Sequence, residues 1–242
     1  MIGKKVIHLE SVDSTNNYAA NMLKTGRVEH GTVIMADEQT NGRGQAGNAW
    51  QSAPGMNLQL SLVLMPQELK LKSQHSLSQV VSVSLVKLLR SKGLESQIKW
   101  PNDIFIKDHK IAGILIENQI KGQDIKSSIV GVGINVNQSE FKELNATSFF
   151  LETGVKSSIS ELLLSWVYHF NLCYKPLSIG QFEEVKKEYY SMLLGYRSLR
   201  RFEDKNGVFA GIIEGVDEYG KLLLFKEGVE QSYDLKEIKF MF

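Results

Sequence analysis

The sequence predicts an α+β fold in which a mixed, largely antiparallel sheet is flanked by helices and followed by a small C-terminal β-barrel. Several short segments alternate apolar and polar residues with a period of two, as strands with one buried face do. Other segments repeat apolar residues at helical spacing. Beyond residue 195 the chain changes to short strand-like segments separated by hairpin turns. We therefore expect one domain over residues 1–195 and a second over residues 196–242.

Length and composition favour a soluble cytoplasmic protein. The chain has 242 residues and a formal net charge of +1, from 28 basic and 27 acidic residues. A charge so nearly balanced gives no overall field that would attract nucleic acid or an anionic membrane. Cys173 is the one cysteine, which excludes an intramolecular disulfide framework and fits a reducing compartment. We accordingly expect neither a nucleic-acid nor a membrane partner.

The first part of the chain is predicted to contain three strands and one short helix. Strand-like residues cover 4–10, 31–37 and 58–64. The helix follows a cluster of N-cap residues at 13–16 and ends near Gly26. The segment 39–50 lies between the second and third strands, and its residues follow neither the two-residue period of a strand nor the 3.6-residue period of a helix.

The remaining chain is predicted to alternate helices with two groups of strands. Three helices are expected, beginning near Ser76, Ser158 and Gln181. A short strand is expected at 96–99. Three further strands are expected at 104–107, 111–120 and 125–137, and because the connections between them are short, we expect them to pair as antiparallel neighbours. Cys173 falls on an apolar helix face, where we expect a core thiol.

Residues suited to chemistry gather in four segments: 14–17, 39–50, 100–110 and 131–137. Each has a structural explanation when taken alone, namely a helix cap, a flexible turn, a hairpin and a strand bulge. The pair Gly131 and Gly133 lacks the third glycine and the following helix of a dinucleotide-binding fingerprint. The chain also contains no Walker loop, zinc motif or Gly-x-Ser-x-Gly elbow. The function must therefore be sought in the combination of segments.

Taken together and in order, these segments resemble biotin protein ligases. The matching motifs are Gly42-Arg43-Gly44 with Trp50 beyond it, Trp100-Pro101-Asn102-Asp103, Lys110-Ile111-Ala112-Gly113-Ile114-Leu115-Ile116-Glu117, and Gly131-Val132-Gly133-Ile134-Asn135. The resemblance runs from about residue 8 to the C-terminus. It implies the catalytic fold of biotin and lipoate ligases followed by an SH3-like barrel. Because the chain begins within the catalytic domain, it resembles the monofunctional type that has no N-terminal DNA-binding domain.

The resemblance implies an ATP-dependent ligase that works in two steps. Biotin and ATP would form biotinyl-5'-AMP, and biotin would then pass to a specific lysine of a biotin carboxyl carrier protein or domain of a carboxylase. The carboxylate of biotin and the α-phosphate repel each other unless cations neutralise them. The family pattern assigns that task to Lys110 and Arg43. It also makes Asp103 either the residue that orients Lys110 or a candidate ligand of Mg²⁺ on the triphosphate.

The resemblance further implies two sets of binding residues. Biotin contacts are expected from Ser14, Thr15, Asn16, Gln39, Gly42, Arg43, Lys110, Gly113 and Leu115. ATP and adenylate contacts are expected from Arg43, Gly44, Gln45, Trp50, Asn102, Lys110 and Asn135, with the Trp50 ring stacked on adenine. We expect the loop 39–50 to close over both ligands.

One departure from the family concerns charge in that loop. Many bacterial members carry further arginines after Gly-Arg-Gly, whereas this chain has Gln45, Ala46 and Asn48. We therefore expect retention of the adenylate to depend more on ordering of the loop than on its charge.

Two alternatives remain open from the sequence. A lipoate or octanoate ligase of the same superfamily would share the central lysine, although the Gly-Arg-Gly and Trp-Pro-Asn-Asp motifs are the biotin-type forms. A non-catalytic biotin- or nucleotide-binding module would have no need of Lys110, Arg43 and Asp103 together. The sequence also leaves open the acceptor's identity, the role of the barrel, and a homodimer formed through an uncovered edge strand.

Overall fold

A seven-stranded sheet forms the centre of the protein. The computed structural model describes residues 2–66, 69–71, 74–141 and 145–241. The strands lie in the order β1-β2-β3-β7-β6-β5-β4. Only β1 and β2 pair in parallel, and the other neighbours are antiparallel, which confirms the expected mixed sheet. The strands are β1 (Val6–Val12), β2 (Val33–Gln39), β3 (Leu58–Leu64), β4 (Gln97–Lys99), β5 (Asp103–Ile106), β6 (His109–Lys121) and β7 (Asp124–Ile134).

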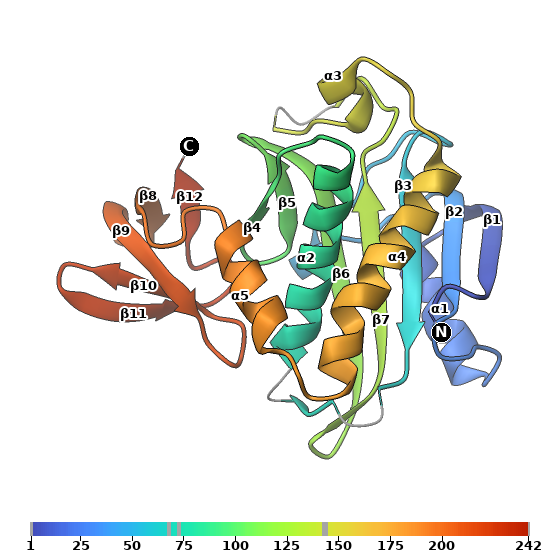
Figure 1. Ribbon diagram of the computed structural model, residues 1–242, viewed down its shortest axis with the longest axis horizontal. Helices are drawn as coiled ribbons and strands as arrows, with labels where there is room; N and C mark the ends of the chain where they lie inside the picture. The colour runs from blue at the N-terminus through green and yellow to red at the C-terminus, as the bar shows by residue number, and fades with distance from the viewer. Residues whose placement is uncertain (1, 67–68, 72–73, 142–144, 242) are drawn as a thin grey trace.

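Three helices cover one face of this sheet: α2 (Gln74–Ser91), α4 (Ile159–Ser178) and α5 (Glu183–Met192), which Figure 1 shows side by side. Their apolar stripes share one buried cluster with Leu58, Leu60, Leu62 and Leu64, alternate residues of β3. Because neighbouring residues of a strand point to opposite faces, Gln59, Ser61 and Val63 must face the other side. The fold therefore has an apolar face under the three helices and a second face with a different composition.

The second face carries helix α1 (Thr15–Lys24) and a smaller apolar cluster that contains Ala19, Ile34, Val63 and Ile129. Only part of this face is covered, because α1 packs near β2, β3 and β7. Where α1 ends, Gly113 and Leu115 of β6 and Gly131 and Gly133 of β7 line a cavity.

The C-terminal segment forms a second, five-stranded antiparallel sheet in the order β11-β10-β9-β8-β12. Its strands are β8 (Leu199–Asp204), β9 (Gly207–Val216), β10 (Leu222–Lys226), β11 (Val229–Tyr233) and β12 (Lys239–Met241). Hairpin turns join β8 to β9, β9 to β10 and β10 to β11, which confirms the predicted succession of strands and turns. No described residues pair β11 with β12, so this SH3-like unit is an open sheet and the expected hydrogen-bonded closure into a barrel is not observed. The indole Nε1 of Trp100 donates to the carbonyl of Gly220 at 2.9 Å and ties this unit to the main sheet.

Local differences from the sequence prediction have simple causes. Helix α3 (Phe149–Thr153) was not predicted because five residues are too few to show a helical period. The glycines of β7 lie in regular pairing, so the bulge considered for them is absent. Cys173 is buried as predicted, and burial raises the pKa of its thiol to about 11, which leaves it unreactive. None of the described helices combines the length and the apolar character needed to cross a membrane.

Candidate active site

A cavity of about 200 Å³ opens on the sheet face that carries α1. It brings together residues from all four segments that the sequence singled out. The described residues that line it are Ser14, Thr15, Asn16, Gln39, Arg43, Gly44, Gln45, Ala46, Asn48, Ala49, Trp50, Leu60, Pro101, Asn102, Asp103, Lys110, Gly113, Ile114, Leu115, Gly131, Val132, Gly133, Leu235 and Lys236. The tertiary structure thus converts four separate motifs into one site.

Glycines of β6 and β7 form the floor of the cavity, because side chains from other segments lie against the backbone of these two strands. Gly113 of β6 and Gly133 of β7 are register partners. A Cβ at Gly133 would overlap the indole of Trp50, and one at Gly113 would lie 3.2 Å from Cζ3 of the same ring. At Gly131 a Cβ would lie 2.6 Å from Oδ1 of Asn16. The groups that approach these glycines are the side chains of Trp50 and Asn16.

The N-terminus of α1 supplies a polar wall. The Oε1 atom of Gln39 accepts hydrogen bonds from the backbone nitrogen of Thr15 at 2.8 Å and from its hydroxyl at 3.1 Å. The Nε2 atom of Gln39 donates to Gln59 at 3.0 Å, and the hydroxyl of Ser61 contacts Thr15 Oγ1 at 2.8 Å. This network fixes the amide of Gln39. Ser14, the N-cap of α1, also lines the cavity, and its side chain makes no capping hydrogen bond. The wall therefore presents preorganised donors and acceptors.

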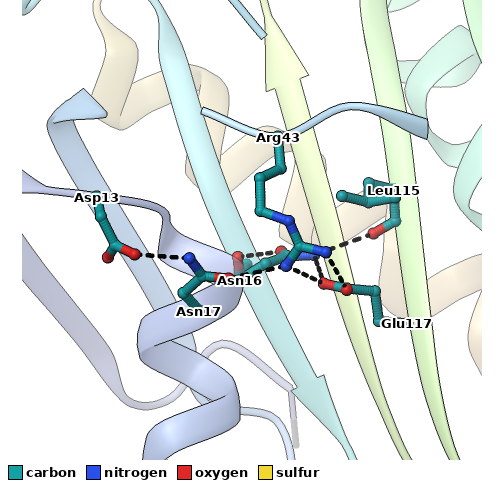
Figure 2. Close-up of polar contacts among 7 residues, drawn as sticks. Asp13, Asn16, Asn17, Arg43, Leu115 and Glu117 are labelled. Atoms are coloured by element: carbon teal, nitrogen blue, oxygen red, sulfur yellow. Dashed lines mark hydrogen bonds and ion pairs between the residues drawn. The ribbon is translucent and has the colours of Figure 1, made fainter. Parts of the chain in front are cut away.

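Arg43 joins the glycine-rich loop to α1 and β6 (Figure 2). Its Nη2 lies 2.6 Å from Oε1 of Glu117, and its Nη1 lies 3.2 Å from Oε2 and 2.8 Å from Oδ1 of Asn17. The second oxygen of Glu117 also accepts from Nδ2 of Asn16 at 2.8 Å. Bidentate geometry favours a guanidinium over any other cation at this position. Asp13 continues the network by accepting a hydrogen bond from Nδ2 of Asn17. This hydrogen bond lowers the pKa of the Asp13 carboxyl group.

Lys110 and Asp103 form an ion pair at the opposite end of the cavity. Their Nζ and Oδ1 atoms are 2.6 Å apart, and the two side chains are 33% and 20% exposed. The ammonium also lies 5.7 Å from the centre of the Trp50 ring, within range of a cation–π interaction. Both residues belong to the hairpin formed by β5 and β6, in which Asp103 pairs with Gly113 and Lys110 pairs with Phe105. A cation is thereby fixed beside the aromatic ring and the glycine floor.

The potential metal ligands in the cavity suit a magnesium ion that is bound mainly by a triphosphate. They do not suit an ion that is coordinated by protein side chains alone. Among the described residues, no three His, Cys, Asp or Glu side chains form a metal-binding group. Of the described residues that line the cavity, Asp103 is the one carboxylate, and Lys110 already pairs with it. Magnesium prefers few carboxylates together with phosphate oxygens and water, so a single carboxylate is compatible with it.

Two predicted site residues lie outside the cavity lining. Asn135 is 4% exposed, and its amide donates to the carbonyl of Thr147 at 3.0 Å, so it holds the segment behind Lys110. Gly42 does not line the cavity, but a Cβ there would overlap the carbonyl oxygen of Trp50. Asn102 does line the cavity and donates to the carbonyl of Ile114 at 2.6 Å.

The C-terminal unit contributes two lining residues that sequence reasoning missed, Leu235 and Lys236. The Nζ of Lys236 donates to the carbonyl of Ala46 at 2.8 Å, which fastens the glycine-rich loop to the C-terminal unit. The two residues are 190 positions apart, and no local pattern could have paired them. The pairing of Glu117 with Arg43, 74 positions earlier, was likewise not predicted.

We expect Glu117→Gln to loosen the loop around Arg43. Neutralising the carboxylate removes a partly exposed ion pair worth up to about 1 kcal/mol, so cleavage of the loop should accelerate about two- to fivefold. Arg43 is the one basic residue between Gln39 and Trp50, which makes tryptic cleavage after it a direct measurement. The exposed Glu140→Gln provides the matched control. Equal cleavage rates in the two variants would show that the ion pair does not hold the loop.

Solved structures define the class of protein to which this fold and cavity belong. The biotin protein ligase from Aquifex aeolicus, in complex with biotin and ATP, superposes with a TM-score of 0.81 at 30% identity. The match covers 98% of this chain and 99% of that one. Both the main sheet and the C-terminal unit are therefore shared with an enzyme of the ligase class.

Sequence comparison assigns the family. The biotin/lipoate A/B protein ligase family model matches residues 8–135. A biotin--[acetyl-CoA-carboxylase] ligase from Paracoccus denitrificans is 36% identical over 247 residues, covering 96% of this chain and 99% of the relative. The bifunctional ligase/repressor BirA of Bacillus subtilis is 32% identical over 241 residues, covering 96% of this chain and 73% of the relative. This chain belongs to the biotin/lipoate A/B protein ligase family.

Proposed function

We propose that this protein is a biotin protein ligase, which activates biotin with ATP as biotinyl-5'-AMP and transfers it to a lysine of a carrier protein. The observation that carries the proposal is the cavity in which the Lys110–Asp103 pair, the Trp50 ring and the glycine floor meet. A site that only bound biotin would need no fixed ammonium beside the position of a reacting carboxylate. Family membership and the likeness to a ligase bound to biotin and ATP support the same conclusion.

In the first step, a carboxylate oxygen of biotin attacks the α-phosphorus of ATP and pyrophosphate leaves. Two anions must approach each other, and Lys110 supplies a cation at that point. Asp103 holds the Lys110 ammonium in place through the 2.6 Å ion pair. Magnesium on the triphosphate would neutralise the leaving pyrophosphate. Arg43, seated on Glu117, adds a second cation at the loop side of the cavity.

The polar wall at α1 is our proposed site for the ureido ring of biotin. Ser14, Thr15, Asn16 and Gln39 offer hydroxyl and amide groups in fixed positions, which suits a ring with both N–H donors and a carbonyl acceptor. Such a site discriminates strongly, because an analogue that lacks the matching groups leaves buried polar atoms unpaired. Gly113 and Leu115 would lie along the apolar part of biotin, and Trp50 beside the adenine.

In the second step, the neutral amine of the acceptor lysine attacks the carbonyl carbon of the adenylate. An amide bond forms, AMP leaves with the bonding electron pair, and the amine loses a proton. Lys110 can also stabilise the charge that develops on the leaving phosphate. We propose a biotin carboxyl carrier protein or domain as the acceptor and, since ATP is the co-substrate, the cytoplasm as the compartment.

Exchange of labelled pyrophosphate into ATP tests the proposal. We expect exchange that requires biotin, because the first step is reversible when no acceptor is present. Exchange with lipoate but not with biotin would instead establish the lipoate branch of the family. A protein that bound biotin without any exchange would be a binding module, and the proposal would be wrong.

We expect release of biotinyl-5'-AMP to depend only weakly on salt. Among the loop residues in the cavity lining, Arg43 is the sole cation, since Gln45, Ala46 and Asn48 are neutral. Screening by salt can therefore weaken few charge interactions between the loop and the adenylate. The dissociation rate of the adenylate should change less than about threefold across the salt range in which the Debye length falls from about 10 to 3 Å. Gln45→Arg with Asn48→Arg is the comparison variant, which should be more salt-sensitive. A steep dependence in the unaltered protein would assign retention to charge instead of loop order.

A further inference from the structure

A second cavity lies where the helix layer meets the C-terminal unit, and the proposed ligase reaction does not use it. Its volume is about 390 Å³, and its walls come mainly from the first two turns of α2, the junction of α4 and α5, and the turn between β9 and β10. Figure 1 shows α5 between α2 and the strands of the C-terminal unit. Of the residues that the structure describes, none lines both this cavity and the active site. A ligand bound here would therefore occupy a site of its own.

The side chain of Gln79 indicates that this cavity accepts a polar ligand. Gln79 belongs to the second turn of α2, is 4% exposed and lines the cavity. Within the described part of the chain, its amide makes no hydrogen bond. Burying an amide without a partner is costly, and buried amides in native proteins nearly always have one. A ligand in the cavity would supply the partner that the protein does not.

Carboxylates dominate the charge of this cavity. Glu183, Asp217 and Glu218 line it, and none of them takes part in the ion pairs found among the described residues. Two lysines also line it, but the ammonium of Lys70 already pairs with Asp124 at 2.7 Å. Three carboxylates therefore outweigh the one remaining lysine, and the cavity favours a positively charged ligand.

The arrangement suits an organic cation better than a metal ion. Among the described residues, no three His, Cys, Asp or Glu side chains come close enough together to hold a metal, so the carboxylates are spread out. Apolar side chains that include Phe182 and Val216 also line the cavity and can pack against methylene groups. Burial lowers the pKa of His75 to about 4, so this lining imidazole is neutral at neutral pH and does not repel a cation.

We propose that this cavity is a binding site for a small organic polyamine, an alkyl chain that carries two or more ammonium groups. An ammonium would donate hydrogen bonds to Oε1 of Gln79 and to the carboxylate of Asp217. Oδ1 of Asp217 accepts from the backbone nitrogens of Tyr219 and Lys221 at 2.9 Å each, which fixes the carboxylate and leaves Oδ2 for a ligand. Because these contacts come from α2 and from the turn between β9 and β10, the ligand would also hold the C-terminal unit against the helix layer.

Calorimetric titration with spermidine tests the charge of the site. The unaltered protein should bind spermidine saturably with a dissociation constant below about 1 mM. Octane-1,8-diol, an uncharged chain of equal length, should not bind. Glu183→Gln should weaken spermidine binding about threefold, because the carboxylate it removes is exposed. Glu184→Gln is the matched control, since the next residue of α5 is equally exposed but does not line the cavity, and binding should not change.

Gln79→Leu tests the buried amide independently. This variant should bind spermidine at least about tenfold more weakly, because it loses a hydrogen bond to a charged group. Its melting temperature without ligand should equal or exceed that of the unaltered protein, since the amide it removes has no partner in the fold. The melting curve thereby separates lost binding from lost folding. Absence of saturable spermidine binding, unchanged binding by Gln79→Leu, or equal effects of the two glutamate substitutions would overturn the proposal.

Discussion

Lys110→Ala should lower biotin-dependent pyrophosphate exchange about a thousandfold, the upper end of the loss seen when one charge-stabilising group is removed. The ammonium is the cation fixed by Asp103 at the position where biotin carboxylate and α-phosphate would meet. Biotin binding should weaken but persist, because the polar wall at α1 lies at the other end of the cavity. Exchange kinetics together with calorimetric titration of biotin separate these two effects.

The matched control for this experiment is Lys121→Ala. Lys121 is an exposed lysine at the far end of the same strand, β6, so it tests the loss of a positive charge without a change in the cavity. Exchange in this variant should equal that of the unaltered protein. Normal turnover of Lys110→Ala would remove Lys110 from the mechanism, whatever its place in the structure.

Gly133→Ala should reduce exchange about a hundredfold, because one added methyl group would overlap the Trp50 indole. The ring must then leave the glycine floor, and the loop that carries Trp50 must move with it. Since Gly133 also pairs with Gly113 in the centre of the sheet, the backbone cannot easily yield instead. We expect a rise in the KM for ATP and a fall in kcat, both measured by exchange.

A second substitution distinguishes this collision from general damage to the sheet. In a Trp50→Ala background the obstruction is gone, so adding Gly133→Ala should cost less than about threefold, a strongly non-additive result. Gly215→Ala is the control in the C-terminal sheet, where the added Cβ would meet its nearest atom at an ordinary 3.5 Å. Additive effects of the two cavity substitutions would show that Gly133 does not act through Trp50.

The sequence determined most of the secondary structure and the composition of the site. Alternating residues such as those of 58–64 define strands within a window of seven residues, and the residues at 13–16 mark a helix start. The motifs also supplied most of the predicted site residues that line the cavity, although Leu235 and Lys236 were missed and Gly42 and Asn135 lie outside the lining. Boundaries shifted by only a few residues at β1, α2 and α5.

Tertiary structure alone decided which of these residues interact. Arg43 pairs with Glu117, 74 positions later, and Lys236 reaches Ala46 across 190 positions. Tertiary structure also places Asn135 outside the cavity lining, where it donates to the carbonyl of Thr147, and leaves the C-terminal sheet open. Local propensities act over a few residues, whereas strand order, register and side-chain contacts follow from packing of the whole chain. For that reason the sequence could supply the parts of this site, and only the fold could join the glycine floor to Trp50 and the loop to the C-terminal unit.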